Sequence, residues 1–287
     1  MCIRDRLIDF KTSGKQIIAY SNYYSQYSYL LCSVADKIYL NPNGFIDLKG
    51  ISASVVFFKN LLAKIGIETQ IIRKGQFKSA VEPFTETKMS ESSRLHTKLL
   101  IEDISEFMTN CISEERNIEV SKINNDINEL RLNSAAACKK LNYIDEILYE
   151  DQLKDSLKLF SSSTKIKTIN LKNYVNVKLN NKQKISRNKI AVIYANGTIS
   201  NNKGSINEIG TQTITKSLTQ AREDKNVKAI VLRVNSPGGS AMTSDLIWRE
   251  TIITKKEKPI IVSMGDYAAS GGYYIACAAD SLSLIHI

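Results

Sequence analysis

Histidine is almost absent from this chain of 287 residues, which has only His96 and His286. The five cysteines are scattered and form no C-x-x-C pair, so their spacing signals neither a zinc site nor a disulfide framework. No apolar run is long enough to span a bilayer, and no G-x-x-x-x-G-K phosphate loop occurs. We therefore expect no metal and no cofactor.

The two ends of the chain need separate treatment. One back-translation of residues 1–6 is complementary to one of residues 282–287, so both ends can be a single DNA element read from opposite strands. We interpret them as sequencing-adaptor artefacts and exclude them from fold reasoning. The natural chain then runs from Leu7 to Ser281, and we expect it to be truncated at both ends. His286 falls in the excluded tail, which leaves His96 as the one credible histidine.

The net charge of +10 raises the question of nucleic acid or an anionic membrane surface. The lysines are spread along the chain, however, and no RNA-binding aromatic motif accompanies them. We expect a solvated, lysine-rich surface and no nucleic-acid partner.

Strand and helix patterns alternate in two regions, which is typical of an α/β fold with parallel sheets. In the first region the predicted strands are 16–21, 36–40 and 67–73, and the predicted helices are 22–35 and 55–65. Helical patterns follow at 90–111, 133–141 and 151–160. In the second region the predicted strands are 189–195, 227–234 and 259–264, and the predicted helices are 207–222 and 240–254. The polar stretch 161–188 between the regions is the predicted linker, although 166–171 is also compatible with a strand.

An internal repeat connects the two regions. Residues 15–18 match 258–261, and after a one-residue gap residues 22–29 lie over 266–273. Gln26 then takes the place of Ser270. Self-similarity of this length is a signal about the fold, and here it suggests a duplicated α/β domain in which only one copy could carry a nucleophile.

Glycines follow the predicted strand 227–234. Residues 234–240 read VNSPGGS and lead into a helix. Glycines at such a place let the backbone approach a ligand and present N–H groups to a developing oxyanion. The alternative is a tight strand-to-helix turn that needs glycine for a positive φ, and the composition supports both interpretations.

Ser270 lies in a second loop, Ala268-Ala269-Ser270-Gly271-Gly272, which also follows a strand and opens a helix. A serine at a helix start can act as a nucleophile whose oxyanion is held by main-chain donors. The alternative is that Ser270 is only an N-cap. The loop is not the G-x-S-x-G nucleophile elbow, because Ala268 occupies the first glycine position.

A nucleophilic serine needs a base. His96 lies in a polar helical stretch, where a solvated helix histidine is the expected role. Lys78 follows the predicted strand 67–73 and is flanked by Phe77, Val81 and Phe84. Apolar surroundings desolvate a lysine amine and favour the neutral form that a base requires.

Three runs, RVNSPGGSA, SMGDYAASGGYYIA and GQFKSAVEPF, resemble signal peptide peptidase A, also called protease IV, in its long, duplicated form. The resemblance extends over Leu7 to Ser281. It implies two tandem ClpP/crotonase-like domains, both truncated here. A lysine-donating domain with a helical extension would span 7–160, a linker 161–188, and a serine-donating domain 189–281.

Site residues follow from the same resemblance. Ser270 would be the nucleophile and Lys78 the general base. Gly271 and an N–H of the Gly238–Gly239 loop would form the oxyanion hole. The resemblance further implies peptide substrates such as cleaved signal peptides, a homo-oligomer, and an N-terminal anchor, missing here, in the bacterial inner membrane with the enzyme on the periplasmic face.

Two other functions remain open. A crotonase-type acyl-CoA enzyme could polarise a thioester with the same loop N–H groups and would need no nucleophile at Ser270. An inactive scaffold fragment is the other alternative, since Gln26 shows that one copy can lose the serine.

Overall fold

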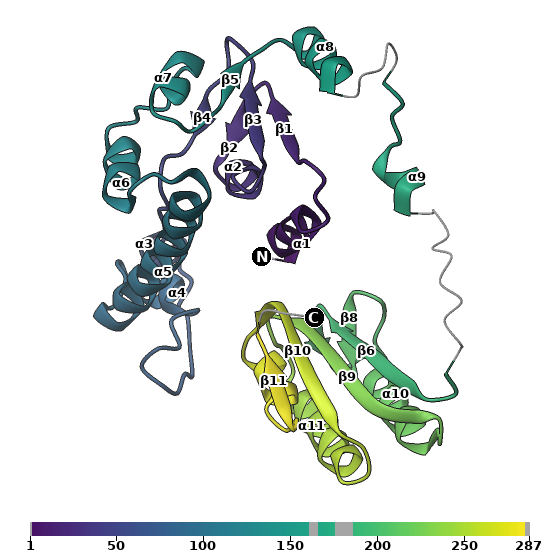
Figure 1. The fold of residues 1–287 in the computed structure, drawn as a ribbon. Coiled ribbons are helices and arrows are strands. Elements are labelled where there is room, and N and C mark those ends of the chain that lie inside the picture. The colour runs from purple at the N-terminus through teal and green to yellow at the C-terminus, as the bar shows by residue number, and fades with distance from the viewer. Residues whose placement is uncertain (1, 161–165, 176–185, 285–287) are drawn as a thin grey trace. The chain divides into compact units, whose positions relative to one another are not determined.

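Apolar runs rich in β-branched residues pair into parallel sheets in two parts of the chain (Figure 1). The structure, a computed structural model, describes residues 2–160, 166–175 and 186–284. The chain divides into two compact units. We call Ile3–Ile169 the N-terminal unit, and Asn170–Ile287 together with Met1–Cys2 the C-terminal unit. The predicted α/β class with parallel sheets is confirmed.

The C-terminal unit contains a parallel sheet of four strands in the order β11-β10-β9-β6. These strands are β6 (Lys189–Asn196), β9 (Val227–Ser236), β10 (Ile260–Ala268) and β11 (Ser281–Ser283). The helices of this unit are α9 (Leu171–Val175), α10 (Thr211–Glu223), α11 (Ala241–Lys255) and α12 (Gly271–Ala276). A separate parallel pair is formed by β7 (Thr198–Ser200) and β8 (Glu208–Gly210).

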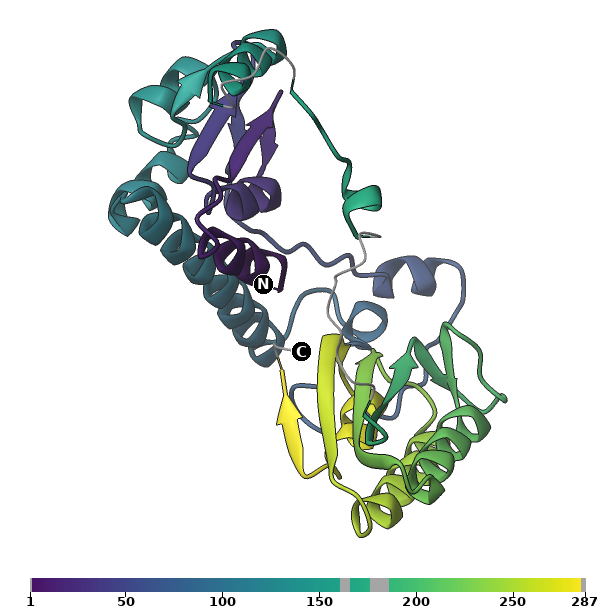
Figure 2. The same cartoon turned by 45° about the vertical axis from the view of Figure 1, so that its right-hand side comes forward.

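One face of this sheet packs against helices, and α10 and α11 run along it (Figure 2). From Ile230 to the end of β9 every second residue is buried, including Leu232 and Val234, as expected for side chains that alternate between the faces of a strand. Because β9 and β10 are parallel neighbours, their carboxyl ends lie at the same edge of the sheet. The loops that lead into α11 and α12 therefore start next to each other.

The N-terminal unit has a three-stranded parallel sheet, β1-β3-β5, and a parallel pair, β2-β4. Its strands are β1 (Ile18–Ser21), β2 (Tyr24–Ser25), β3 (Lys37–Leu40), β4 (Ile46–Asp47) and β5 (Glu146–Ile147). Its helices are α1 (Cys2–Lys11), α2 (Gln26–Cys32), α3 (Lys59–Lys64), α4 (Glu82–Thr85), α5 (Glu91–Arg116), α6 (Val120–Asn128), α7 (Ala135–Lys140) and α8 (Glu150–Phe160). Tyr29 and Tyr143 are fully buried in its core, and the Tyr29 hydroxyl donates to the Tyr143 carbonyl over 2.7 Å.

Each unit contains a strand–helix–strand segment held by an aspartate at the start of its second strand. In the N-terminal unit, the Ile17 N–H donates to Asp36 Oδ2 over 2.7 Å and the Asp36 N–H donates to the Ile17 carbonyl over 2.9 Å. In the C-terminal unit, Ile260 and Asp280 make the same two bonds, both of 2.9 Å.

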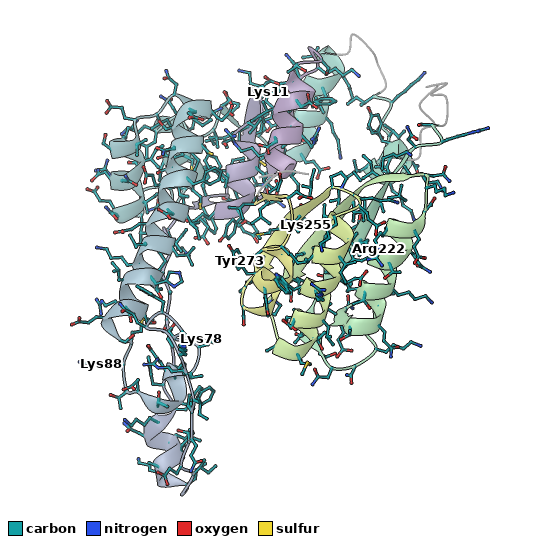
Figure 3. All side chains as sticks on the ribbon, turned by 90° about the horizontal axis from the view of Figure 1, so that it is seen from below. Lys11, Lys78, Lys88, Arg222, Lys255 and Tyr273 are labelled. Carbon is teal, nitrogen blue, oxygen red and sulfur yellow. The ribbon has the colours of Figure 1, made fainter. Side chains whose placement is uncertain are left out.

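A lysine completes each set of contacts (Figure 3). Lys11 Nζ lies 3.6 Å from Asp36 Oδ1 and donates to the Val34 carbonyl over 2.9 Å. Lys255 Nζ lies 3.8 Å from Asp280 Oδ1 and donates to a carbonyl, that of Ala278, also over 2.9 Å. The repeat seen in the sequence is thus accompanied by corresponding contacts.

Some element predictions were wrong. Residues 67–73 form no strand and pair with none of the strands in the described part of the chain, and the predicted helix 55–65 is reduced to α3. Helix α6 was not predicted. Residues 166–170 are irregular, so the strand considered there does not form.

The cysteines differ from one another in burial: Cys111 and Cys138 are buried, whereas Cys277 is exposed.

The predicted linker and tails lie partly outside the described residues. These uncovered parts are 161–165 and 176–185 of the linker, together with residue 1 and residues 285–287. Residues 2–6 begin α1, and Ser281–Ser283 form β11. No helix within the described ranges has the length and apolar character needed to cross a membrane.

Candidate active site

The loop between β9 and α11 has backbone conformations that favour glycine. Gly238 has a φ of 101° and Gly239 a φ of 150°, values that residues with a Cβ rarely adopt. The loop is held by Ile199, whose N–H donates to the Gly238 carbonyl over 2.9 Å and whose carbonyl accepts from the Ser240 N–H over 2.8 Å. The tight-turn interpretation is therefore correct for this loop, and it is compatible with a binding role.

Ser270 stands at the N-cap position of α12 but makes no capping hydrogen bond. Its φ is 51° and its ψ is −119°, an uncommon backbone conformation for a residue with a side chain. The residue is exposed, and its hydroxyl has no hydrogen-bond partner within the described part of the chain. A strained, exposed serine that does not cap its helix is typical of a functional position rather than a structural one.

The two loops touch each other. The Ala269 N–H donates to the Ser236 carbonyl over 3.0 Å. A Cβ atom placed on Gly238 would lie 2.7 Å from both the Gly271 nitrogen and the Ser270 Cβ. The backbone of Gly238 therefore lies directly against the start of α12. The structure brings together four of the predicted site residues, Gly238, Gly239, Ser270 and Gly271, within the C-terminal unit.

The main-chain donors at this contact differ in their partners. The Gly238 N–H donates to Ser236 Oγ over 3.1 Å. The described residues provide no acceptor for the N–H groups of Gly239 and Gly271. Two unsatisfied donors beside a serine hydroxyl are the arrangement needed to stabilise an oxyanion. Of the two glycines of the loop, Gly239 is therefore the better candidate donor.

Lys78 belongs to the N-terminal unit and lies in the irregular segment between Arg73 and α4; Figure 3 labels it, together with Lys88, which follows α4. Its side chain is exposed. The flanking Phe77 and Phe84 are themselves 55% and 43% exposed. Within this unit the predicted desolvation of Lys78 by its apolar neighbours is therefore wrong: these neighbours face solvent and do not bury the amine.

His96 is exposed on α5, where its ring meets the Phe77 ring edge-on with centroids 6.4 Å apart. This agrees with the prediction of a solvated helix histidine. Within the described residues, no cluster of three or more His, Cys, Asp or Glu side chains is arranged to hold a metal ion.

Sequence reasoning missed Glu82, a carboxylate in the segment that carries Lys78. Glu82 is only 2% exposed, although a glutamate is normally a surface residue. The nearest signal was its place among Ala80, Val81, Pro83 and Phe84 in the run that carries the family resemblance.

Comparisons with known proteins place the chain in a peptidase family. The sequence model of peptidase family S49 matches residues 9–162 and 252–284, which is more than half of the chain. Protease 4 of Haemophilus influenzae is 37% identical over 283 residues, covering 94% of this chain and 46% of that protein. The chloroplastic serine protease SPPA of Arabidopsis thaliana is 32% identical, covering 98% of this chain and 42% of that protein.

A shorter match is to the putative signal peptide peptidase SppA of Enterococcus faecium, which is 37% identical over 102 residues, 34% of this chain and 30% of that protein. The chain thus spans less than half the length of these curated relatives.

Proposed function

Because the chain belongs to peptidase family S49, we propose that it supplies both catalytic residues of a serine endopeptidase, with Ser270 as nucleophile and Lys78 as general base. The observation that carries this proposal is the conformation of Ser270. Its backbone has a positive φ, its hydroxyl caps no helix, and the adjoining loops hold two main-chain donors for which the described ranges offer no acceptor. A serine with only a structural role would not need such strain.

In the proposed reaction the neutral amine of Lys78 accepts the Ser270 hydroxyl proton while Oγ attacks a peptide carbonyl carbon. The negative charge that develops on the carbonyl oxygen is stabilised by the N–H groups of Gly239 and Gly271. When the C–N bond breaks, the Lys78 ammonium returns its proton to the leaving amine. Water then attacks the acyl-enzyme with Lys78 again as base and releases Ser270.

This mechanism requires Lys78 to reach Ser270 from a different compact unit. We propose that the two units are copies of one ClpP/crotonase-like domain and that each contributes half of the catalytic pair. The matching contacts of Asp36 and Asp280, with their lysines, support this duplication. The mechanism requires a desolvation of Lys78 that its own apolar neighbours do not supply.

We further propose that the substrates are peptides such as cleaved signal peptides. Support comes from the similarity to relatives, one of which is a putative signal peptide peptidase. A homo-oligomer, an N-terminal anchor, and a location at the periplasmic face of the bacterial inner membrane belong to the same proposal.

Covalent labelling with a fluorophosphonate tests the catalytic pair without any knowledge of the peptide specificity. We expect the probe to modify Ser270, with the modified peptide identified by mass spectrometry. Lys78→Ala should slow the labelling by a factor on the order of 10³, since the serine then lacks its base. Lys74→Ala is the matched control, because Lys74 is an exposed lysine in the same segment.

The possible outcomes separate the candidate functions. Equal labelling of the wild type and of Lys78→Ala would reject the lysine as base. No labelling of Ser270 in the wild type would favour the acyl-CoA enzyme or the inactive scaffold over the peptidase.

A further inference from the structure

The segment that carries Lys78 has little regular structure. Between Arg73 and Ser90 only α4 is helical, and the remainder consists of turns and irregular backbone. A catalytic base has to be held in a defined place, since small displacements of a reacting group cost large factors in rate. Some other interaction must therefore fix this backbone.

Glu82 provides such an interaction. Glu82 is 2% exposed, and both of its carboxylate oxygens have hydrogen-bond partners. Oε1 accepts from the Ser90 hydroxyl over 2.7 Å and from Arg73 Nη1 over 3.2 Å, while Oε2 accepts from the Ser90 N–H over 3.1 Å. A buried carboxylate is tolerated only when it is paired and hydrogen-bonded in this way. These bonds, first that of the Ser90 hydroxyl, lower the pKa of Glu82 and keep it ionised.

The partners of Glu82 lie on both sides of Lys78 in the sequence. Arg73 precedes the lysine, and Ser90 follows it as the N-cap of the long helix α5. Ser90 Oγ also accepts from the Ser93 N–H over 3.2 Å, so the carboxylate ties the segment to the rigid start of that helix.

Two further bonds tighten the stretch next to Lys78. The Ser92 hydroxyl donates to the Gln76 carbonyl over 3.0 Å, and the Glu82 N–H donates to the Ser79 carbonyl over 2.9 Å. The backbone is therefore held immediately before and immediately after the lysine.

We propose that Glu82 is a positioning residue: its buried carboxylate closes the segment from Arg73 to Ser90 and thereby fixes the place of Lys78 within the N-terminal unit. This inference rests on the proposed function of Lys78. Glu82 itself takes no part in proton transfer to the substrate.

The test is the isosteric substitution Glu82→Gln, made in the whole chain. We expect kcat and the rate of fluorophosphonate labelling to fall by about 10–100-fold, because the base is displaced. KM should change by less than about twofold, because peptide binding is not affected. Glu86→Gln is the matched control. Glu86 lies in the same segment but is exposed, and its carboxylate has no partner within the described residues.

A double variant distinguishes positioning from a general loss of structure. If Glu82 acts through Lys78, Glu82→Gln should cause no further loss of labelling rate in a Lys78→Ala background. An equal loss in both backgrounds would overturn the proposal. Unchanged labelling in Lys78→Ala alone would instead reject the proposed function, and the inference with it. If Lys78→Ala is impaired and Glu82→Gln is not, only the positioning role is rejected.

Hydrogen–deuterium exchange gives a readout that does not depend on activity. Glu82→Gln should increase amide exchange in residues 74–81 and leave that of α6 unchanged, because the lost bonds act locally. Should Glu82→Gln fail to fold, Arg73→Met removes one partner of the carboxylate from a side chain that is 37% exposed. For Arg73→Met we expect a smaller loss of labelling rate, again with increased amide exchange in residues 74–81 and not in α6. Exchange and labelling like those of the wild type would contradict the proposal.

Discussion

In both units a strand leads into a short helix and then into a parallel partner strand, and in both an aspartate and a lysine hold the segment together. The segments differ where the helix begins. At the start of α2, Ser25 has a φ of −70° and a ψ of 160°, and its side chain accepts from the Ser28 N–H as an ordinary N-cap. At the start of α12, Ser270 has a φ of 51° and makes no such bond. The same framework thus carries a relaxed helix start in one unit and a strained one in the other.

The main-chain donors near these helices differ as well. In the N-terminal unit the Gln26 side chain satisfies two main-chain donors near the start of α2. Its Oε1 accepts from the N–H groups of Lys49 and Gly50, over 3.2 and 3.1 Å. In the C-terminal unit the N–H groups of Gly239 and Gly271 have no acceptor among the described residues. Satisfied polar groups favour stability, whereas unsatisfied donors are available to a ligand. In this comparison the donors left open to a ligand are those of the C-terminal unit.

The largest expected effect comes from replacing Ser270 by alanine, with the corresponding replacement of Ser25 as the comparison. Ser270→Ala should reduce peptidase activity by a factor on the order of 10⁴ and abolish fluorophosphonate labelling, because the nucleophile is lost. Ser25→Ala should leave activity unchanged and lower the free energy of unfolding by about 1 kcal/mol, the usual cost of losing an N-cap. Peptide cleavage and urea unfolding measure the two effects. Comparable losses of activity in both variants would contradict the assignment of roles.

Gly238→Ala tests the contact between the two glycine loops. The new methyl group would lie 2.7 Å from the Gly271 nitrogen, at a φ of 101°, so we expect a loss of about 3 kcal/mol in unfolding free energy and of most labelling of Ser270. Gly66→Ala is the control: its φ is 73°, but nothing lies within 4 Å of the added atom, so only about 1 kcal/mol of backbone strain is expected. Similar behaviour of the two variants would show that the loops do not pack as described.

Replacing the two framework aspartates tests whether the segments are equivalent. Asp36→Ala and Asp280→Ala each remove an acceptor from an isoleucine N–H and the partner of a lysine. We expect each to lower the unfolding free energy by about 1–2 kcal/mol, with labelling of Ser270 affected more by Asp280→Ala. Equilibrium unfolding followed by circular dichroism gives both values. A measurable cost at one aspartate and none at the other would argue against a duplicated framework.

The smallest effect is expected at Gln26. Gln26→Ala leaves two N–H groups without their side-chain acceptor, and water can hydrate these groups in part. We therefore expect the free energy of unfolding to fall by about 1 kcal/mol, with no change in labelling of Ser270. Gln16→Ala, at an exposed glutamine, should change neither quantity. A gain of fluorophosphonate labelling at Ser25 in the Gln26→Ala variant would mean that the N-terminal segment also retains catalytic capacity.

Much of the C-terminal unit was predictable because its signals are local. The runs that form β9 and β10 are apolar and β-branched, and glycines mark the loops after them. The failure at residues 67–73 has a physical cause: a strand is stabilised by its neighbours, and a run such as Ile67–Arg73 remains irregular when no partner strand is present. The burial of Glu82 was equally unpredictable, since a glutamate is normally exposed and the arginine and serine that pair with it lie elsewhere in the chain.

The sequence by itself determined the order and type of the main elements, the two glycine loops, the internal repeat and the choice of Ser270 and Lys78 as candidates. All of these depend on periodicity, residue type or short motifs, which are properties of neighbouring residues. Only the tertiary structure decided that Ser270 has a positive φ, that Gly238 donates to Ser236 while Gly239 does not, and that Lys78 is exposed within its own unit. The reason is that backbone strain, unsatisfied donors and burial are set by whichever distant segments pack against a residue, and local sequence does not encode those partners.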